Sequence, residues 1–410
     1  MVYVVAGNKI LDSIRSKNAE SRNFHNSLRY FLVISQAFGL LPVENIRQPH
    51  QKLQFRWKSF KVLYTCVLIL LTGFFILTTF FVYKHGYNLS DLGTFNELFY
   101  HSGTIVTLIL YLRLARKWPN FAKCWCRMDK IMARNYNYPK KLDKRLRICT
   151  AICLTLSIVD YISNVYCRYH ALEKTFGENY NYKIYYEHSF HKFFKVIPIN
   201  IFTASYCSLI TFHATLVQAI NDLFIILFSV VLALRFKQIT QRLEGDFPQL
   251  QEKPQEYWME IREDYDRLST LCKELDDHVS YIVLLSYSTN IFFLLVQLYN
   301  SLELVMGAVG KIYFVFSFVH LIFRIVFVSL HGAWINDESL GPVNILNSIS
   351  SKCYNIEVRR LLMQIGFDNV ALTGCRMFKI TRGIILSIAG AVVTYELVLI
   401  QFNVATTEAN

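Results

Sequence analysis

The stretch Val196–Leu234 reads VIPINIFTASYCSLITFHATLVQAINDLFIILFSVVLAL and carries one charged residue, Asp222, in 39 residues. At about 1.5 Å per residue, one helix of this length would reach about 58 Å, roughly twice the thickness of a bilayer core. A hairpin of two spans would need a turn, yet no Gly or Pro occurs between Ile199 and Gly245. We therefore predict one helix that crosses a membrane and projects beyond it, with the hairpin as the alternative.

Further apolar runs flank this stretch, and each is long enough to cross a bilayer, which takes roughly 20 residues. They are Ser59–Val82, Phe95–Leu112, Ile148–Tyr166, Val279–Leu302, Ile312–Leu330 and Gly383–Phe402. A shorter run of 14 residues, Tyr30–Val43, is predicted to form an interfacial or re-entrant helix. Charged residues make up 18% of the chain, whereas soluble proteins have about 25%. The sequence therefore predicts an all-α polytopic membrane protein with seven transmembrane helices.

Lys and Arg are unevenly divided between the loops. If the N-terminus is inside, the inner segments contain 34 of them and the outer segments 7. Because positively charged loops stay in the cytoplasm, we predict a cytoplasmic N-terminus and an extracellular C-terminus. The single glycosylation sequon, at Asn88, then lies in an outer loop. The net charge of +13 reflects this orientation, so nucleic acid is not expected as a partner.

Other classes of membrane protein fit less well. A G-protein-coupled receptor has the opposite orientation, and its acidic-Arg-Tyr and Asn-Pro-x-x-Tyr motifs are missing from the expected spans. A secondary transporter would show repeated halves with spans broken by Gly or Pro. His188 and His191 have no third ligand nearby, and the ten cysteines form no CxxC pair. We expect no metal, cofactor or enzyme activity, and leave open whether Cys167 and Cys207 pair.

The last apolar run has a distinctive face. At about 100° per residue on a helix, one stripe collects residues that are mostly small or polar: Ser387, Gly390, Thr394, Leu397 and Gln401. Small residues allow helices to pack closely, so the stripe is suited to a helix–helix interface. It is also suited to a pore lining, with Thr394 and Gln401 facing water and Leu397 as an apolar constriction.

The same run resembles a known family. Thr394-Tyr395, five residues, then Gln401-Phe402 resembles the TYxxxxxQF signature of insect gustatory receptors, and the full TYELVLIQF is similar to their sugar-receptor branch. Supporting pieces are Phe38-Gly-Leu-Leu-Pro42, Arg113-Leu-Ala-Arg-Lys-Trp-Pro119 and Val370-Ala-Leu-Thr-Gly374. The resemblance implies a sugar-gated, non-selective cation channel in the plasma membrane of chemosensory neurons. It also implies a tetramer, either a homomer or a heteromer with related receptors, surrounded by membrane lipid. A chemoreceptor that signals through a separate partner is the alternative.

In that family the seventh helix lines the pore and the fourth to sixth helices continue into a cytoplasmic anchor. The resemblance therefore implies a division into a cytoplasmic N-terminus (1–58), spans one to six with an outer ligand pocket (59–334), a cytoplasmic helical segment (335–379), the pore helix (380–402) and an extracellular tail (403–410). Glu256–Asp277 is predicted to lead into span five as a helix. Pro342–Met363 is predicted to be helical with a coiled-coil-like seam of Leu346, Ile349, Cys353 and Ile356, or else to lie on the inner leaflet.

Polar residues within spans are costly, so they are expected to face the bundle interior. Asp160 is the leading candidate to accept sugar hydroxyls, and Asn164 lies one turn outward on the same face. Further candidates for ligand contact are Thr203, Tyr206, Gln297, Asn300 and His320, the last with an interhelical hydrogen bond as its alternative role. Arg324 is predicted to extend towards the inner surface, and Asp222 to lie at the inner boundary and support the anchor.

Overall fold

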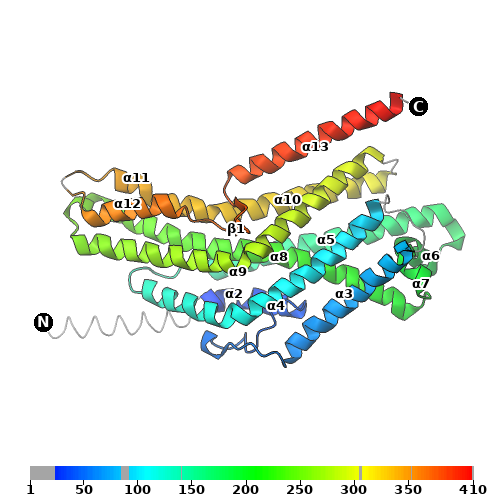
Figure 1. The fold of residues 1–410 in the computed structure, drawn as a ribbon, viewed down its shortest axis with the longest axis horizontal. Coiled ribbons are helices and arrows are strands. Elements are labelled where there is room, and N and C mark those ends of the chain that lie inside the picture. Colours follow the sequence, from blue (N-terminus) through cyan, green and yellow to red (C-terminus); the bar gives the residue numbers. More distant parts are fainter. Residues whose placement is uncertain (1–23, 85–91, 140, 304–306, 352, 409–410) are drawn as a thin grey trace.

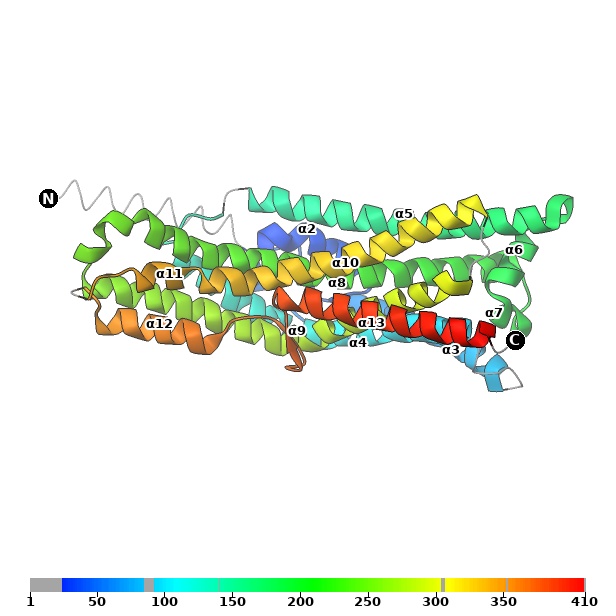
Figure 2. The ribbon, with the colours of Figure 1, turned by 90° about the horizontal axis from the view of Figure 1, so that it is seen from above.

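The computed structural model describes residues 24–84, 92–139, 141–303, 307–351 and 353–408. Long helices run side by side along one axis (Figures 1 and 2). In chain order the elements are α2 (Phe24–Ala37), η1 (His50–Lys52), α3 (Phe60–Lys84), α4 (Leu92–Met132), α5 (Leu142–Phe176), η2 (Gly177–Asn179), α6 (Tyr182–Ser189), α7 (His191–Val196), α8 (Ile201–Gly245), η3 (Phe247–Glu252), α9 (Gln255–Glu303), α10 (Ala308–Leu340), α11 (Pro342–Asn347), α12 (Ile356–Asp368), β1 (Thr373–Gly374), β2 (Phe378–Lys379) and α13 (Gly383–Glu408).

The prediction of seven apolar spans is confirmed. Six of the described helices, α3, α4, α5, α8, α9 and α10, are long and apolar enough to cross a membrane. The seventh, α13, has a shorter apolar stretch, Gly383–Val398, and continues as helix to Glu408. Several spans are longer than their apolar runs, because polar helical turns extend them at one end. The charged stretch Glu256–Asp277 is one such extension, and it is continuous with α9 as predicted.

Helix α8 is the centre of the bundle. It is a single helix of 45 residues, so the long-helix prediction is confirmed and the hairpin alternative is wrong. It begins at Ile201 because the Asn200 side chain accepts from the backbone N–H of Phe202 and Thr203, which caps the first turn. Its most apolar 18-residue window is completely buried by the other helices. A helix that is apolar on every side is stable only where other helices surround it.

The first described helix begins and ends earlier than predicted. The run Tyr30–Val43 was expected to be helical, but α2 ends at Ala37. Gly39 then adopts φ +75°, and a Cβ there would come within 2.6 Å of Leu68, so the chain turns closely against α3. Phe24 and Leu28 are completely buried. Helix α2 therefore packs into the bundle, against α4, α5 and α8.

The prediction of a continuous helix with a seam over Pro342–Met363 is wrong. Two helices, α11 and α12, replace the expected single one, and Ile349 and Cys353 lie in the break between them. A new helix begins because the Asn355 side chain accepts from the N–H groups of Glu357 and Val358. Leu346 is completely buried within this chain. The proposed seam of four residues is therefore not formed.

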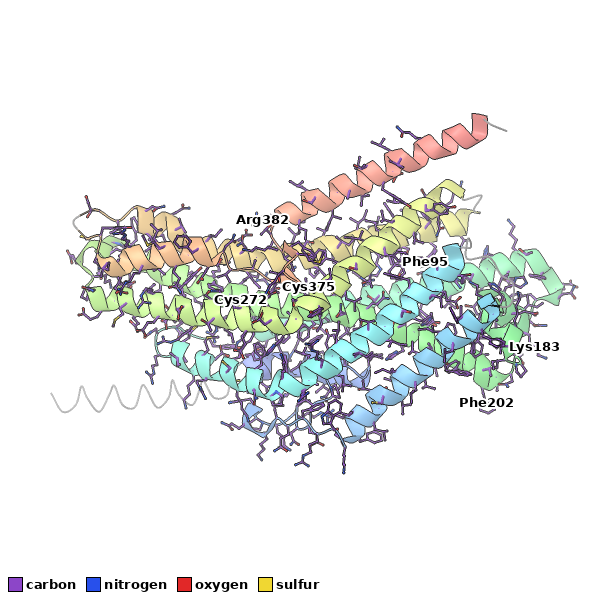
Figure 3. The ribbon with its side chains drawn as sticks, in the orientation of Figure 1. Phe95, Lys183, Phe202, Cys272, Cys375 and Arg382 are labelled. Atoms are coloured by element: carbon purple, nitrogen blue, oxygen red, sulfur yellow. The ribbon has the colours of Figure 1, made fainter. Side chains whose placement is uncertain are left out.

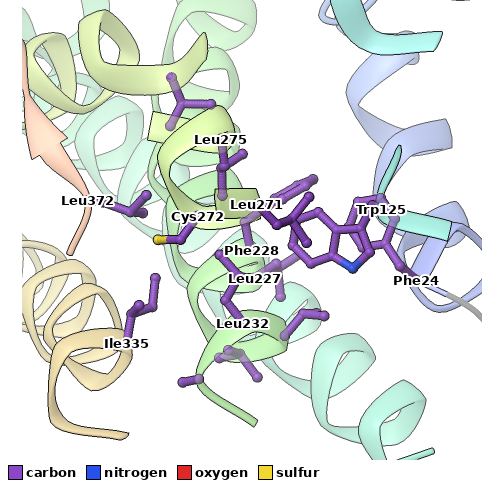
Figure 4. Close-up of a cluster of buried hydrophobic side chains, with 14 of the residues drawn as sticks. Phe24, Trp125, Leu227, Phe228, Leu232, Leu271, Cys272, Leu275, Ile335 and Leu372 are labelled. Carbon is purple, nitrogen blue, oxygen red and sulfur yellow. The ribbon is translucent and has the colours of Figure 1, made fainter. Parts of the chain in front are cut away.

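We use the term anchor for the end of the bundle formed by residues 235–245, 255–277 and 334–340 with α11 and α12. Within the anchor and beside it, apolar side chains from several helices form one core, including Phe228, Leu271 and Ile335 (Figure 4). Ion pairs cover its surface. One of them, between Arg262 and Glu357 at 2.6 Å, holds the pKa of that carboxyl below its usual value. Helix α12 is thus fixed along α9.

Helix α13 is separate from this core over most of its length. Its first turns pack against the bundle through Ile384, Ile388 and Val392. Further along, the helix diverges from α10 (Figure 1). A two-stranded hairpin, with Thr373 paired to Lys379 and Gly374 to Phe378, connects α12 to the base of α13.

Candidate functional site

Asp160 and His320 face each other between α5 and α10. Oδ2 of Asp160 lies 3.5 Å from Nδ1 of His320, and the two side chains are 24% and 5% exposed. Oδ1 of Asp160 and Nδ1 of His320 are buried without a hydrogen-bond partner among the described residues. Leaving a buried polar atom unpaired costs roughly 1–3 kcal/mol. A ligand hydroxyl that reached these atoms would remove this cost.

Aromatic and amide groups continue the cluster outward. Nδ2 of Asn164 donates to the hydroxyl of Tyr313 in α10 at 2.5 Å. Tyr161 donates to the Ser208 carbonyl oxygen of α8 at 3.1 Å, and its ring packs edge-on against Phe212. The region therefore combines hydroxyl-binding groups with flat apolar faces, which is the chemistry that recognises a sugar.

Asp222 is the centre of a buried polar network that joins three helices. Its Oδ2 accepts from Nε and Nη2 of Arg324 at 2.9 and 2.7 Å. Its Oδ1 accepts from Oγ of Ser286 at 2.5 Å, and Nδ2 of Asn290 lies 3.1 Å from both oxygens. We call these four residues the Asp222 network. It links α8 to α9 and α10.

The prediction for Arg324 is therefore wrong. Arg324 does not extend towards the inner surface, because a carboxylate from another span neutralises it where it lies. Asp222, which was predicted to lie at the inner boundary, lies level with Arg324, Ser286 and Asn290 in the bundle.

A small cavity lies beside both polar groups. Its volume of about 20 Å³ has room for about one water molecule. Helices α5, α8 and α10 line it, and its polar side chains are Cys153, Ser157, Asp222, His320 and Arg324. His320, which faces Asp160, thus lines the same small cavity as Asp222 and Arg324.

The other predicted ligand residues lie apart from Asp160. The hydroxyl of Thr203 completes the cap of α8 and donates to the Pro198 carbonyl at 3.0 Å. Tyr206 donates to the Leu71 carbonyl of α3 at 2.6 Å. Gln297 donates to the Phe314 carbonyl of α10 at 3.5 Å, and Asn300 is half-buried near the end of α9. Asp160 and His320 face each other, and Asn164 lies one turn from Asp160 on the same helix.

The predicted stripe on α13 faces outward. Its members are exposed: Ser387, Gly390, Thr394, Leu397 and Gln401. The packed residues Ile384, Ile388 and Val392 lie on the other side of the helix, about 140° away at 100° per residue. The stripe is thus available to other subunits or to water.

Asn88 lies outside the described residues, so the structure does not bear on its modification. Cys167 and Cys207 do not form a disulfide, and both are free thiols. In the described part of the chain no three His, Cys, Asp or Glu side chains come together as metal ligands.

The comparison with protein families decides the family. The model described as "Trehalose receptor" matches residues 9–409. The chain belongs to the trehalose receptor family. It is 29% identical to the gustatory receptor for sugar taste 64a of Drosophila melanogaster, over 93% of this chain and 84% of that one. It is 27% identical to gustatory receptor 5a for trehalose from the same fly, over 93% and 85% of the two chains.

A solved structure has the same fold. The insect olfactory receptor OR5 from Machilis hrabei, in complex with eugenol, superposes with a TM-score of 0.68 at 16% identity, over 92% of this chain and 97% of that one. The resemblance to the sugar-receptor branch of insect gustatory receptors is therefore confirmed. These relatives are receptors, not enzymes.

Tyr313 and the Asp222 network were not found by sequence reasoning. Tyr313 is one of 25 tyrosines, and nothing in its neighbourhood distinguishes it. Asp222 and Arg324 did carry a signal, because opposite charges in two spans stabilise each other when they pair.

Proposed function

We propose that this chain is a sugar receptor that acts as a ligand-gated, non-selective cation channel. It would assemble as a tetramer, alone or with related receptors, in the plasma membrane of chemosensory neurons. Family membership supports the receptor class. The sugar ligand is supported by the names of the relatives and by the chemistry of the Asp160 cluster.

The observation that carries the ligand proposal is the unpaired oxygen of Asp160. A buried carboxylate accepts hydroxyl hydrogen bonds more strongly than a neutral group does. His320 Nδ1 is also unpaired beside it, and Asn164 and Tyr313 add polar groups one turn away. Tyr161 and Phe212 offer rings against which the C–H face of a sugar could pack. We include Thr203, Tyr206, Gln297 and Asn300 as weaker contact candidates.

The pore proposal rests on the outward face of α13. Four copies of Gln401 would form a ring of neutral amides near the outer mouth, and Leu397 an apolar ring one turn inward that closes by dewetting. Neutral amides replace part of an ion's hydration without adding charge. Selectivity among cations would therefore be weak. Glu396 lies about 140° around the helix from Gln401 and would face a neighbouring helix.

Expression of this chain alone tests the function. We expect sugar-evoked currents in outside-out patches of transfected cells, recorded without cytoplasmic nucleotides while trehalose, sucrose, maltose and glucose are applied in turn. Untransfected cells are the control. Responses that occur only in intact cells, and that a G-protein inhibitor removes, would instead support signalling through a separate partner.

A further inference from the structure

The base of α13 is held from two sides, and the first contact is with α9. Asp276 of α9 accepts from both the N–H and the hydroxyl of Thr373, at 2.6 and 2.8 Å. One turn further along α9, the Ser280 carbonyl accepts from the N–H of Cys375 at 3.3 Å. Asp276 and Thr373 are both less than 10% exposed. The hairpin before α13 is therefore fixed to α9.

The second contact is with α10. Ile380 packs on Gly332, and Arg382 pairs with Asp337 at 2.7 Å. Cys375 and Arg382 both lie beside the base of α13 in Figure 3. A shift of α9 relative to α10 would therefore act on the first residues of α13 from both sides.

The Asp222 network joins these same two helices further along. Ser286 and Asn290 lie about 15 and 21 Å along α9 from Asp276. Arg324 lies about 20 Å along α10 from Asp337. Asp222 of α8 accepts from all three side chains, and its own side chain is 7% exposed. Since no bulk water can replace a lost partner there, movement between α9 and α10 requires these bonds to rearrange.

The network also adjoins the candidate ligand cluster. His320 and Arg324 are one turn apart on α10, and both line the 20 Å³ cavity with Asp222. A ligand that draws His320 towards Asp160 would act on the same helix turn that Asp222 holds.

We propose that Asp222 is a positioning residue for gating, which holds α9 and α10 in their resting relation and so keeps the base of α13 in its closed position. This proposal rests on the proposed channel function. Asp222 does not touch the sugar. It sets how much of the binding free energy is needed to move the two helices.

The test separates binding from gating. The variant is Asp222→Asn, which keeps an oxygen for Ser286 and Asn290 and removes the charge that holds Arg324. The control is Asp143→Asn, an exposed acid on α5. Direct binding to purified full-length receptor is measured with the sugar that gives the largest wild-type current. Sugar-free current and the half-maximal sugar concentration for current are measured in patches.

We expect Asp222→Asn to raise the sugar-free current at least several-fold. Because less binding free energy is then needed for opening, the half-maximal sugar concentration for current should fall about tenfold or more. The Kd for sugar of the closed, non-conducting receptor should change less than threefold. This Kd is measured on a receptor whose pore is held shut by a cysteine pair engineered at the mouth. The control should match wild type in every measurement.

Several results would overturn the proposal. Wild-type currents and unchanged sugar sensitivity in a surface-expressed Asp222→Asn receptor would show that Asp222 does not act in gating. Parallel loss of binding and current, with no sugar-free current, would make it a ligand contact.

If Asp222→Asn does not reach the surface, the double variant Asp222→Asn/Arg324→Gln removes both charges, so no buried charge is left unpaired. It should reach the surface and show the same raised sugar-free current. A folded double variant with wild-type gating, or one that also fails to fold, would make the network purely structural. A wild-type receptor that reaches the surface and binds sugar but stays silent, both alone and together with related receptors, would instead refute the channel function itself.

Discussion

Gly332 of α10 lies so close to Ile380 that a Cβ on Gly332 would come within 2.6 Å of the Cγ2 atom of that isoleucine. Ile380 is completely buried, and it is followed within three residues by the first residue of α13. The packing of the base of α13 on α10 thus depends on the absence of a side chain at one position.

Gly332→Ala should force Ile380 away and destabilise the receptor by about 1–3 kcal/mol, the usual cost of overpacking. Thermal unfolding of the purified protein measures this. The control is Gly366→Ala in α12, where nothing lies within 4 Å of the added Cβ and helix propensity should give up to about 1 kcal/mol of stabilisation. Equal unfolding temperatures for the two variants would contradict the close contact.

Asp160→Ala should raise the half-maximal sugar concentration by about 10- to 150-fold, because one charge-assisted hydrogen bond contributes roughly 1.5–3 kcal/mol. Dose–response curves of whole-cell current measure the shift, and surface labelling checks expression. Asp143→Ala on the exposed face of the same helix should leave the curve unchanged. A normal curve for the Asp160 variant would remove this residue from the site.

Asp129→Asn should destabilise the fold by about 3–5 kcal/mol, because it leaves Arg235 as an unpaired buried charge. The pair measures 2.7 Å with side chains 2% and 5% exposed, and Asp129 also accepts from the N–H of Phe24. Surface expression should fall accordingly. Arg376→Gln breaks an exposed pair with Asp277 and should change stability by less than about 1 kcal/mol. Similar expression of both variants would refute this ranking.

Cysteines introduced on the exposed face of α13 should react with a thiol reagent, and those on its packed face should not. Substitutions at Ser387, Thr394 and Leu397 are expected to react with a soluble thiol reagent applied to the conducting receptor and to block its current. Substitutions at Ile388 and Val392, which pack on the bundle, should not react. The unmodified receptor controls for the native thiols. Block through the packed positions with no effect at Thr394 and Leu397 would show that the other face lines the pore.

The orientation gives a fifth expectation. An epitope tag added after Asn410 should stain intact cells, because the Lys and Arg distribution puts the C-terminus outside. A tag before Met1 should stain only after permeabilisation. The reverse pattern would overturn the orientation and, with it, the outer position of the Asp160 cluster.

The spans could be predicted from the sequence because a helix that crosses lipid needs a long apolar run. Helices α8 and α9 both contain such a run. The helix break before Asn355 could not be predicted. The hydrophobic residues on both sides of it keep a three- and four-residue spacing, which is typical of one continuous helix. The pairing of Asp160 with His320 could be predicted in part, because polar residues within spans are stabilised when they contact each other. The separation of Tyr206 from them was not accessible, because the side of α8 that meets α3 is decided by packing among many similar apolar residues.

Helices α8 and α5 differ in how much of each surface the chain itself covers. The most apolar window of α8 is buried completely, whereas that of α5 is only 11% buried. A new side chain on α8 must pack against other helices on every side. Most new side chains on α5 need only be apolar enough to face lipid. As such receptors diverge between species, amino-acid replacements should therefore accumulate along α5 and be rejected along α8.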